Sequence, residues 1–184
     1  LVQLGESGKG EAVKLLQSAN PTHRLVAFRA LRKASESEQI LHYANELAKD
    51  SSPALRCEVA ISLRDVPPDK CRDIILNLAE GYDGLDRWYL EALGTAMDGK
   101  ESEMYGILKT RMGMDPLTWS PQMVNLAWRL HPLAAVPDFE QRAMAGELSV
   151  DDRIKALTGL AFIPDKSAAE AMNRIYKNTK QDIV

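Results

Sequence analysis

The first residues with a chemical signature lie near the start of the chain. Gly5-Glu6-Ser7-Gly8-Lys9-Gly10 resembles a phosphate-binding loop, in which backbone amides and a lysine surround a phosphate group. However, Gln3 occupies the position of the first glycine that such a loop needs, and Gly10 replaces the hydroxyl residue that would bind Mg²⁺. We therefore predict a flexible lead into the first helix and no phosphate site.

The histidines and cysteines show no spacing typical of a metal centre. His23, His42 and His131 fall in three separate segments, so we expect surface or capping roles for them. Cys57 and Cys71 are too few for a metal cluster, and neither is accompanied by a nearby histidine. Buried free thiols are the favoured state of both, with a single bridge as the alternative. The sequence thus predicts no metal, no cofactor and no catalytic residue.

Two carboxylates near the middle of the chain suggest a cation site at first sight. Asp83 and Asp86 flank Gly84-Leu85 and offer oxygens of the kind that Ca²⁺ prefers. Two carboxylates without a fuller ligand loop are weak support for such a site. We interpret the pair as a turn and a helix N-cap.

The three tryptophans are candidates for a ligand cage or a docking anchor. Trp88 and Trp128 fall inside predicted helices, where large rings usually fill the space between repeats, so we expect both in the core. Trp119 lies in a long loop just before Ser120-Pro121. It is the best single candidate for an exposed aromatic anchor, because tryptophan often dominates the binding energy of an interface.

The elements that must position these residues form an internal repeat. Five segments align on one pattern, at 21–31, 53–63, 86–94, 120–130 and 152–160. The alignment places five leucines in one column, which are Leu31, Leu63, Leu93, Leu130 and Leu160. Neighbouring leucines of the column are roughly 30 to 37 residues apart, which is the length of two helices and two turns.

Two further columns accompany the leucines. A small or polar residue precedes four of them, namely Ala30, Ser62, Ala92 and Gly159. An arginine stands seven residues before three of them, at Arg24, Arg56 and Arg153. Asp86 and Met123 occupy the arginine position in the third and fourth copies, and a longer interval through 113–119 precedes the fourth. We therefore expect a distorted fourth repeat or a larger loop there.

A second set of helices is expected between these segments. Apolar residues follow the helical period at 12–19, 40–48, 71–79, 104–108 and 168–176. Ser52-Pro53 and Ser120-Pro121 are typical helix starts, and Ser35 with Glu38 and Ser149 with Asp152 fit capping boxes. Gly81 and Gly113 are expected to end helices.

These patterns predict an all-α fold without strands, consisting of a leading helix at 9–19 and five helix pairs, about eleven helices in total. The predicted repeats are 20–50, 51–81, 83–113, 118–147 and 149–179, in one array over residues 1–184. Because each pair can bury its apolar stripe only against its neighbours, we expect an elongated α-solenoid.

The pattern Arg-x-x-Ala/Val-x-x-small-Leu on the first helix of each pair resembles the HEAT repeat. The resemblance covers nearly the whole chain. It implies an armadillo-like superhelix whose second helices line the concave side. The protein-binding surface that we expect on these second helices consists of Glu38, His42, Asn45, Lys49, Lys70, Asp73, Asn77, Asn173 and Lys177, with Trp119 added from the loop. Their charges are mixed, so an ordinary solvated face is the alternative.

A narrower resemblance is carried by the segment from Tyr82 to Gly94. It is similar to the HEAT section of large bacterial proteins described as putative membrane-bound dehydrogenases or haem-binding proteins, where a sugar-dehydrogenase-like propeller and a cytochrome c domain flank the repeats. This chain has no Cys-x-x-Cys-His and so holds no c-type haem itself. The resemblance implies a spacer excised from an exported redox protein, which would be periplasmic; without it, we expect a cytoplasmic protein.

Charge and hydropathy restrict the classes of partner. The formal charge of −3 disfavours duplex nucleic acid, and no apolar run approaches the roughly 20 residues that span a bilayer. We therefore expect a non-catalytic scaffold that binds a protein, a peptide or flanking domains. The alternatives are a nucleic-acid-binding repair module, which a salt-dependent gel shift tests, and a tetrapyrrole lyase of HEAT type, which an absorbance titration with bilin or haem tests.

An excised array should expose the apolar end faces of its terminal repeats, so we predict self-association through them. Sedimentation velocity over a wide concentration range measures this directly. A sedimentation coefficient that rises with concentration supports the prediction, whereas a single monomeric species at high concentration contradicts it.

Overall fold

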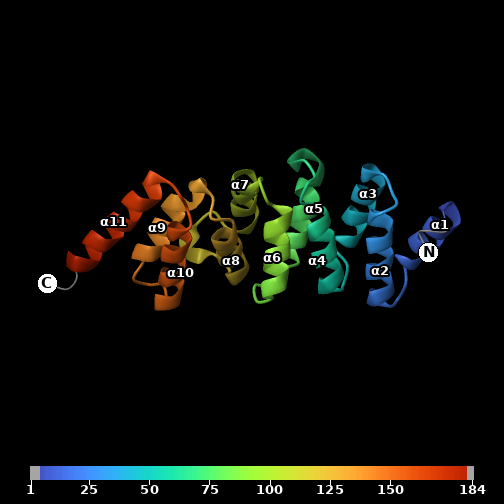
Figure 1. The fold of residues 1–184 in the computed structure, drawn as a ribbon. Coiled ribbons are helices and arrows are strands. Elements are labelled where there is room, and N and C mark those ends of the chain that lie inside the picture. The colour runs from blue at the N-terminus through green and yellow to red at the C-terminus, as the bar shows by residue number, and fades with distance from the viewer. Residues whose placement is uncertain (1–4, 182–184) are drawn as a thin grey trace. The chain divides into compact units, whose positions relative to one another are not determined.

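The computed structural model describes the backbone of residues 5–181 and the side chains of residues 5–178, and over this part of the chain it is built from helices alone (Figure 1). Eleven α-helices and two short 3₁₀ turns are present, without any strand in residues 5–181, so the predicted all-α class and helix number are confirmed. The helices are α1 (Glu6–Leu15), α2 (Pro21–Arg32), α3 (Ser37–Leu47), α4 (Pro53–Ser62), α5 (Pro68–Glu80), α6 (Arg87–Ala96), α7 (Glu101–Met112), α8 (Pro121–Leu130), α9 (Val136–Met144), α10 (Val150–Ala161) and α11 (Lys166–Gln181). The 3₁₀ turns are η2 (Pro116–Thr118) and η3 (Leu133–Ala135).

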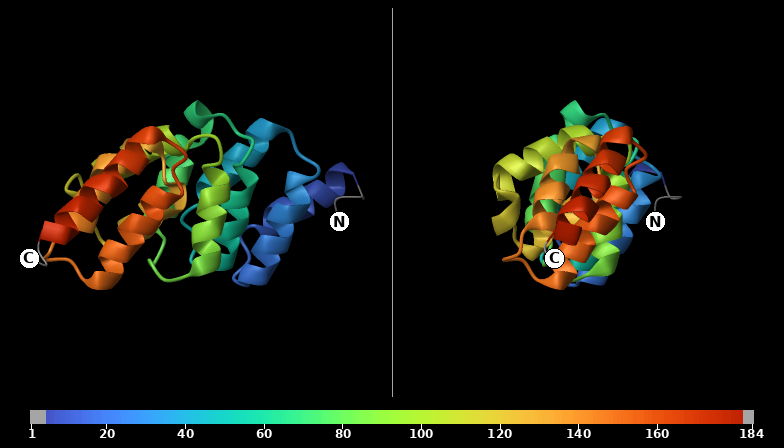
Figure 2. Two further views of the ribbon diagram at one scale, coloured as in Figure 1. Left: turned by 60° about the vertical axis from the view of Figure 1, so that its left-hand side comes forward. Right: turned by 90° about the vertical axis from the view of Figure 1, so that its left-hand side faces the viewer.

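The helices group into two compact units. Unit 1 comprises residues 1–82 and 86–98, and unit 2 comprises residues 83–85 and 99–184. In unit 1, α2 packs on α4 and α4 on α6, which we call the first-helix layer. Helix α3 packs on α5 to form the second-helix layer, and each second helix also contacts the first helix of its own pair (Figures 1 and 2). Helix α1 packs against α2 at the start of this unit.

Unit 2 has its own packing order. Helix α8 packs on α10 and α7 on α8, while α9 and α11 contact each other and both contact α10. Arg174 of α11 donates to both carboxylate oxygens of Glu140 on α9, at 2.5 and 2.7 Å. The stretch that precedes α8 contains η2, which accounts for the longer interval before the fourth predicted repeat.

The leucine column forms part of the core, because all five of its members are buried. The small-residue column has a steric cause at Gly159. A Cβ atom built on Gly159 would lie 2.8 Å from the Phe139 ring of α9, closer than carbon atoms can approach. Helix α10 can therefore pack this tightly on α9 only with glycine at that position.

The three arginines of the repeat all bind a backbone carbonyl at the end of the preceding helix or just beyond it. Arg24 donates to the carbonyl of Ser18 at 2.8 Å, and Arg56 donates to those of Asp50 at 2.6 Å and Gly81 at 3.0 Å. Arg153 donates to the carbonyl of Ala143 at 3.1 Å. Ser18 and Asp50 follow the last residues of α1 and α3, so the guanidinium groups hold the segments that link one helix to the next with charge-assisted hydrogen bonds. Arg24 and Arg56 make the same contact, each with the carbonyl six residues before it, whereas Arg153 makes a related contact with the carbonyl ten residues before it.

Helix starts follow the sequence signals at most positions. Ser52, Ser120 and Ser149 each accept a hydrogen bond from a backbone amide of the first turn that follows, as predicted. The capping box predicted at Ser35 is wrong, because α3 begins at Ser37 and its N-cap is Glu36, without a side-chain hydrogen bond. The flexible lead predicted at residues 5–10 is also wrong, since α1 begins at Glu6 and takes these residues into its first turns.

The arginine contacts should contribute strongly to stability. We expect Arg56→Ala to lower the free energy of unfolding by about 2 to 4 kcal/mol, because it removes hydrogen bonds to two carbonyls and to the buried Tyr89 hydroxyl. Lys166→Ala, at an exposed site on α11, is the matched control and should change it by less than about 0.5 kcal/mol. Urea titration followed by circular dichroism measures both, and equal effects would contradict the role given to Arg56.

Candidate functional site

Exposed apolar side chains distinguish the two layers of unit 1. Among the described residues of this unit, the large apolar side chains that are exposed are Val13 of the leading helix α1 and, in the first-helix layer, Val26 of α2, Ile61 of α4 and Trp88 of α6. Helices α3 and α5 carry no comparable side chain in the described structure. The first-helix layer therefore has the mixed apolar and charged character of a binding surface, whereas the second-helix layer is polar.

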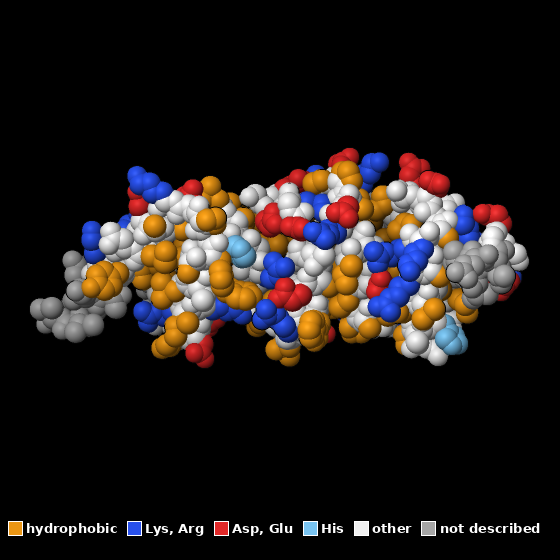
Figure 3. All heavy atoms as spheres, viewed as in Figure 1, with side chains coloured by type: hydrophobic (Ala, Val, Ile, Leu, Met, Phe, Trp, Pro, Cys, Tyr) orange, Lys and Arg blue, Asp and Glu red, His pale blue; other side chains and the backbone are white. Residues whose placement is uncertain are grey.

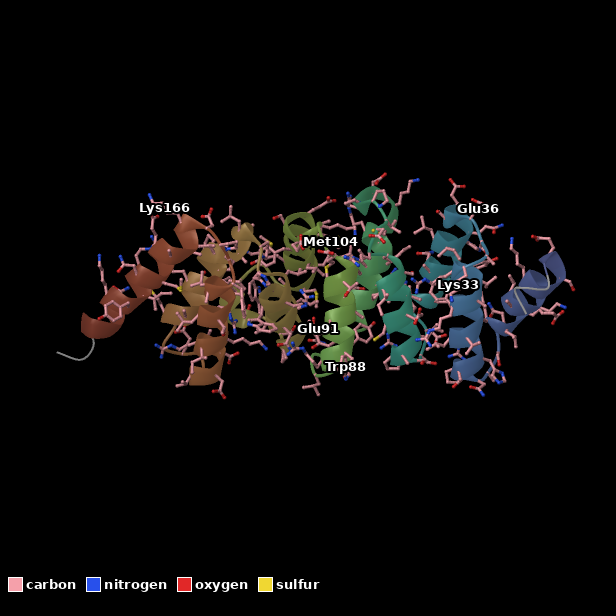
Figure 4. The ribbon with its side chains drawn as sticks, in the orientation of Figure 1. Lys33, Glu36, Trp88, Glu91, Met104 and Lys166 are labelled. Carbon is pink, nitrogen blue, oxygen red and sulfur yellow. The ribbon has the colours of Figure 1, made fainter. Side chains whose placement is uncertain are left out.

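The expectations for two tryptophans are wrong. Trp88 was expected in the core but is 80% exposed, at the start of α6 (Figure 4), where Asp86 caps the helix through the amides of Trp88 and Tyr89. Tyr89 and Leu90 point into the core in its place. Asp86 thus has the N-cap role that the sequence predicts.

Trp119 was expected as an exposed anchor but is 7% exposed. Its Nε1 donates to the carbonyl of Gly113 at 2.7 Å, its ring meets the Tyr105 ring edge-on at 6.3 Å, and the Arg142 guanidinium lies 5.6 Å from its ring centre. Trp119 therefore fixes the loop before α8 within unit 2. The half-buried Trp128 packs edge-on against Phe162, at 6.1 Å between ring centres.

A basic cluster surrounds a buried carboxylate on the first-helix layer of unit 1. Glu58 of α4 is 8% exposed and accepts hydrogen bonds from Arg29 Nε at 2.7 Å and Arg32 Nη1 at 2.5 Å. Lys33 follows at the C-terminus of α2, and these residues line a hollow of about 410 Å³. Figure 3 shows the Lys and Arg side chains gathered over α2 and α4, and Figure 4 marks Lys33 beside α2. We call Arg29, Arg32, Lys33 and Glu58 the basic cluster.

The residues predicted as a binding surface are mostly exposed. On α3 and just beyond it, Glu38, His42, Asn45 and Lys49 are exposed, and His42 Nε2 lies 3.3 Å from Glu46 Oε1. The predicted residues of the other second helices are exposed at Lys70, Asp73, Asn173 and Lys177 and half-buried at Asn77.

The structure brings two of these predicted residues together. Lys49 and Asn77 line one hollow of about 350 Å³ in unit 1, together with Arg56 and Glu80. Asn173 and Lys177 belong to α11 in unit 2. The predicted role of these residues in binding a protein stays a prediction.

A third hollow, of about 320 Å³, lies in unit 2. Trp119 and Val124 contribute to its apolar wall, and Arg142, Asp152 and Lys155 contribute charges. Burial lowers the pKa of the Arg142 guanidinium, although the charge of Asp152 opposes this shift. Arg142 Nη2 donates to Asp152 Oδ1 at 3.2 Å and Nη1 donates to the Pro116 carbonyl, so the guanidinium links α9 to η2 and α10.

A buried polar network in unit 2 has a structural explanation. The Tyr105 hydroxyl of α7 donates to Asp138 of α9, and Lys109 Nζ reaches the same carboxylate at 2.7 and 2.8 Å. Burial, the hydrogen bond to Asp138 and the negative charge of that carboxylate all raise the pKa of Tyr105. The network joins α7 to α9 with a protonated phenol, a state unsuited to a general base at neutral pH.

The cysteines, Asp83 and His131, which were candidates for chemistry, all have structural roles or lie in unreactive surroundings. Cys57 and Cys71 are free, with Cys57 half-buried and Cys71 buried. Burial raises the pKa of the Cys57 thiol to about 11, so little thiolate exists at neutral pH. Asp83 accepts from the Leu85 amide at 2.8 Å as a turn residue. His131 adopts a left-handed conformation with φ of 30° and caps the C-terminus of α8.

Over the described residues, no three His, Cys, Asp or Glu side chains gather into a group able to hold a metal ion. Within the same residues, no helix has the length and hydropathy needed to cross a membrane. No protein-family model, curated protein or solved structure matches this chain.

The basic cluster was missed by sequence reasoning. Arg29 and Arg32 precede Glu58 by 29 and 26 residues, and they lie about one and two helical turns beyond Val26, the position that the leucine column aligns with Glu58. Opposite charges on neighbouring repeats therefore give a weak signal in the sequence, because they do not share one column of the alignment.

The contrast between Trp119 and Trp88 gives a matched test. We expect Trp119→Ala to lower the free energy of unfolding by about 3 to 5 kcal/mol, because it leaves a cavity and an unpaired carbonyl. Trp88→Ala should change it by less than about 1 kcal/mol, since the ring is mostly in solvent. Circular dichroism during urea unfolding distinguishes them, and comparable losses would show that Trp88 also packs in the core.

Proposed function

We propose that this chain is a non-catalytic protein-binding scaffold built as a HEAT-like α-solenoid. The observation that supports it best is the recurring arginine contact: Arg24, Arg56 and Arg153 occupy one column of the repeat, and each binds a carbonyl at the end of the preceding helix or just beyond it. Equivalent residues with equivalent contacts are what stacked helix pairs need. Such a stack presents broad, rigid helix faces, which suit the docking of another protein.

The most favourable docking face is the first-helix layer of unit 1. It combines the exposed ring of Trp88 with the exposed arginine of the basic cluster, and Trp and Arg are the residue types that most often dominate interface energies. Arg29 is already held by its hydrogen bond to Glu58, so it loses less rotamer freedom on binding than an unpaired arginine does. The second-helix rows predicted from the sequence are the other face of the same proposal.

The narrower resemblance suggests which larger protein the scaffold would belong to. In an exported redox protein, the scaffold would hold a propeller and a cytochrome c domain at a fixed separation. Its own binding face would then be available to a further protein or to those domains.

An affinity experiment tests the scaffold and separates its faces. The immobilised chain is exposed to an extract of the source cells, and captured proteins are quantified by mass spectrometry. We expect at least one protein whose capture falls about tenfold or more with Trp88→Ala, because the loss of an aromatic anchor typically costs at least that factor.

Two charge-swapped variants complete the design. K70E/D73K alters the second-helix layer, and K166E/E170K alters an exposed pair on α11; both keep the net charge unchanged. Capture should persist with K166E/E170K. Loss of capture with K70E/D73K alone would mean that the partner binds the second-helix layer. If none of the variants changes the amount captured, the proposal is contradicted.

A further inference from the structure

The basic cluster holds more positive charge than its own carboxylate neutralises. Arg29, Arg32 and Lys33 carry three positive charges and Glu58 one negative charge, which leaves a net charge of +2 in a chain whose total is −3. Both oxygens of Glu58 are occupied, one by each arginine. The cluster is thus a local exception to the charge of the chain as a whole.

Glu58 also fixes the arginines in position. Arg29 uses its Nε for Glu58, and its side chain is 60% exposed, so both of its Nη groups remain available for a ligand. Arg32 uses Nη1 and is 31% exposed. A guanidinium held by a buried partner loses little rotamer freedom when it binds a second anion, which favours bidentate capture of a carboxylate.

The surroundings of the cluster indicate a peptide rather than a small anion. Val26 lies one helical turn before Arg29 on α2, and Ile61 lies one turn after Glu58 on α4, and both are exposed. The hollow of about 410 Å³ between the two helices is larger than one carboxylate requires. A peptide that presents acidic side chains with an apolar residue between them matches this combination of charge and apolar surface.

Three cations around one carboxylate are too few for nucleic acid. Duplex binding at physiological salt normally draws on many phosphate contacts, whereas this cluster offers a net charge of +2. Charge complementarity therefore favours a short acidic segment of a protein.

We propose that the basic cluster and the flanking Val26 and Ile61 bind an acidic peptide segment of a partner protein, with Arg29 and Lys33 pairing with its carboxylates. This inference rests on the proposed scaffold function and specifies the chemistry of its partner. It places the contact on α2 and α4 of the first-helix layer.

Fluorescence anisotropy with a labelled peptide tests the inference on the full chain. The probe is EEELEEE, and the comparison peptide QQQLQQQ has the same length without charge. We expect EEELEEE to bind with a Kd at least about tenfold lower than that of QQQLQQQ, and to weaken as salt is raised. Equal binding of the two peptides would overturn the proposal.

Variants assign the binding to the cluster. R29Q/K33Q should raise the Kd for EEELEEE at least about tenfold while circular dichroism shows an unchanged helical fold. The control K166Q/K177Q removes the same number of charges from exposed positions on α11 and should change the Kd less than about twofold. An equal effect of both variants would mean nonspecific attraction and would overturn the proposal.

A labelled 16-base-pair DNA duplex is the second probe. If it binds more tightly than EEELEEE and R29Q/K33Q abolishes that binding, the cluster is a nucleic-acid site and the proposal fails. If no peptide binds while protein capture still depends on Trp88, the scaffold function stands and only the acidic-peptide inference falls.

Discussion

The hydrogen bond from an arginine to a backbone carbonyl at the end of the preceding helix, or just beyond it, is the contact that ties successive helices together. Helices of 10 to 13 residues, such as α3, α4 and α5, are marginal on their own, so contacts that hold one helix to the next contribute much of their stability. Arg56 binds the segment after α3 through Asp50 and the segment after α5 through Gly81, and the Tyr89 hydroxyl, which donates to the Leu78 carbonyl, adds a third connection. Where the column lacks arginine, other groups take over: Asp86 caps its own helix, and Arg142 approaches the loop before α8 from the opposite side.

The helices themselves were predictable because their signals are local. The leucine column, the serine caps and the apolar stripes are readable within one or two turns, and the same residues are buried or bonded in the structure. The capping box predicted at Ser35 was wrong because α3 starts two residues later, where no side-chain cap is formed. The prediction for residues 5–10 was wrong because Gly8 and Gly10 lie inside α1, where the helical backbone tolerates them, and Gly5 is the N-cap.

The candidate site was less predictable because its contacts are not local. Trp88 sits in the first turn of α6, where the rotation of the helix sends Tyr89 and Leu90 inward and leaves the larger ring in solvent. Trp119 looked exposed in a loop, but Gly113 and Arg142 enclose it, and the partner on α9 is 23 residues away. The pairing of Arg29 and Arg32 with Glu58 joins two repeats, so a charge count along one helix does not reveal it.

The contact between Gly159 and Phe139 links the sizes of two residues that are far apart in the chain. The ring already fills the space that a methyl group on α10 would need, and no backbone strain enters, because Gly159 has ordinary helical geometry. A larger residue at 159 therefore becomes acceptable only if 139 shrinks, for example to leucine, so that the summed volume stays constant. We therefore expect the side-chain volumes at 159 and 139 to covary during evolution, so that a larger residue on α10 accompanies a smaller one on α9.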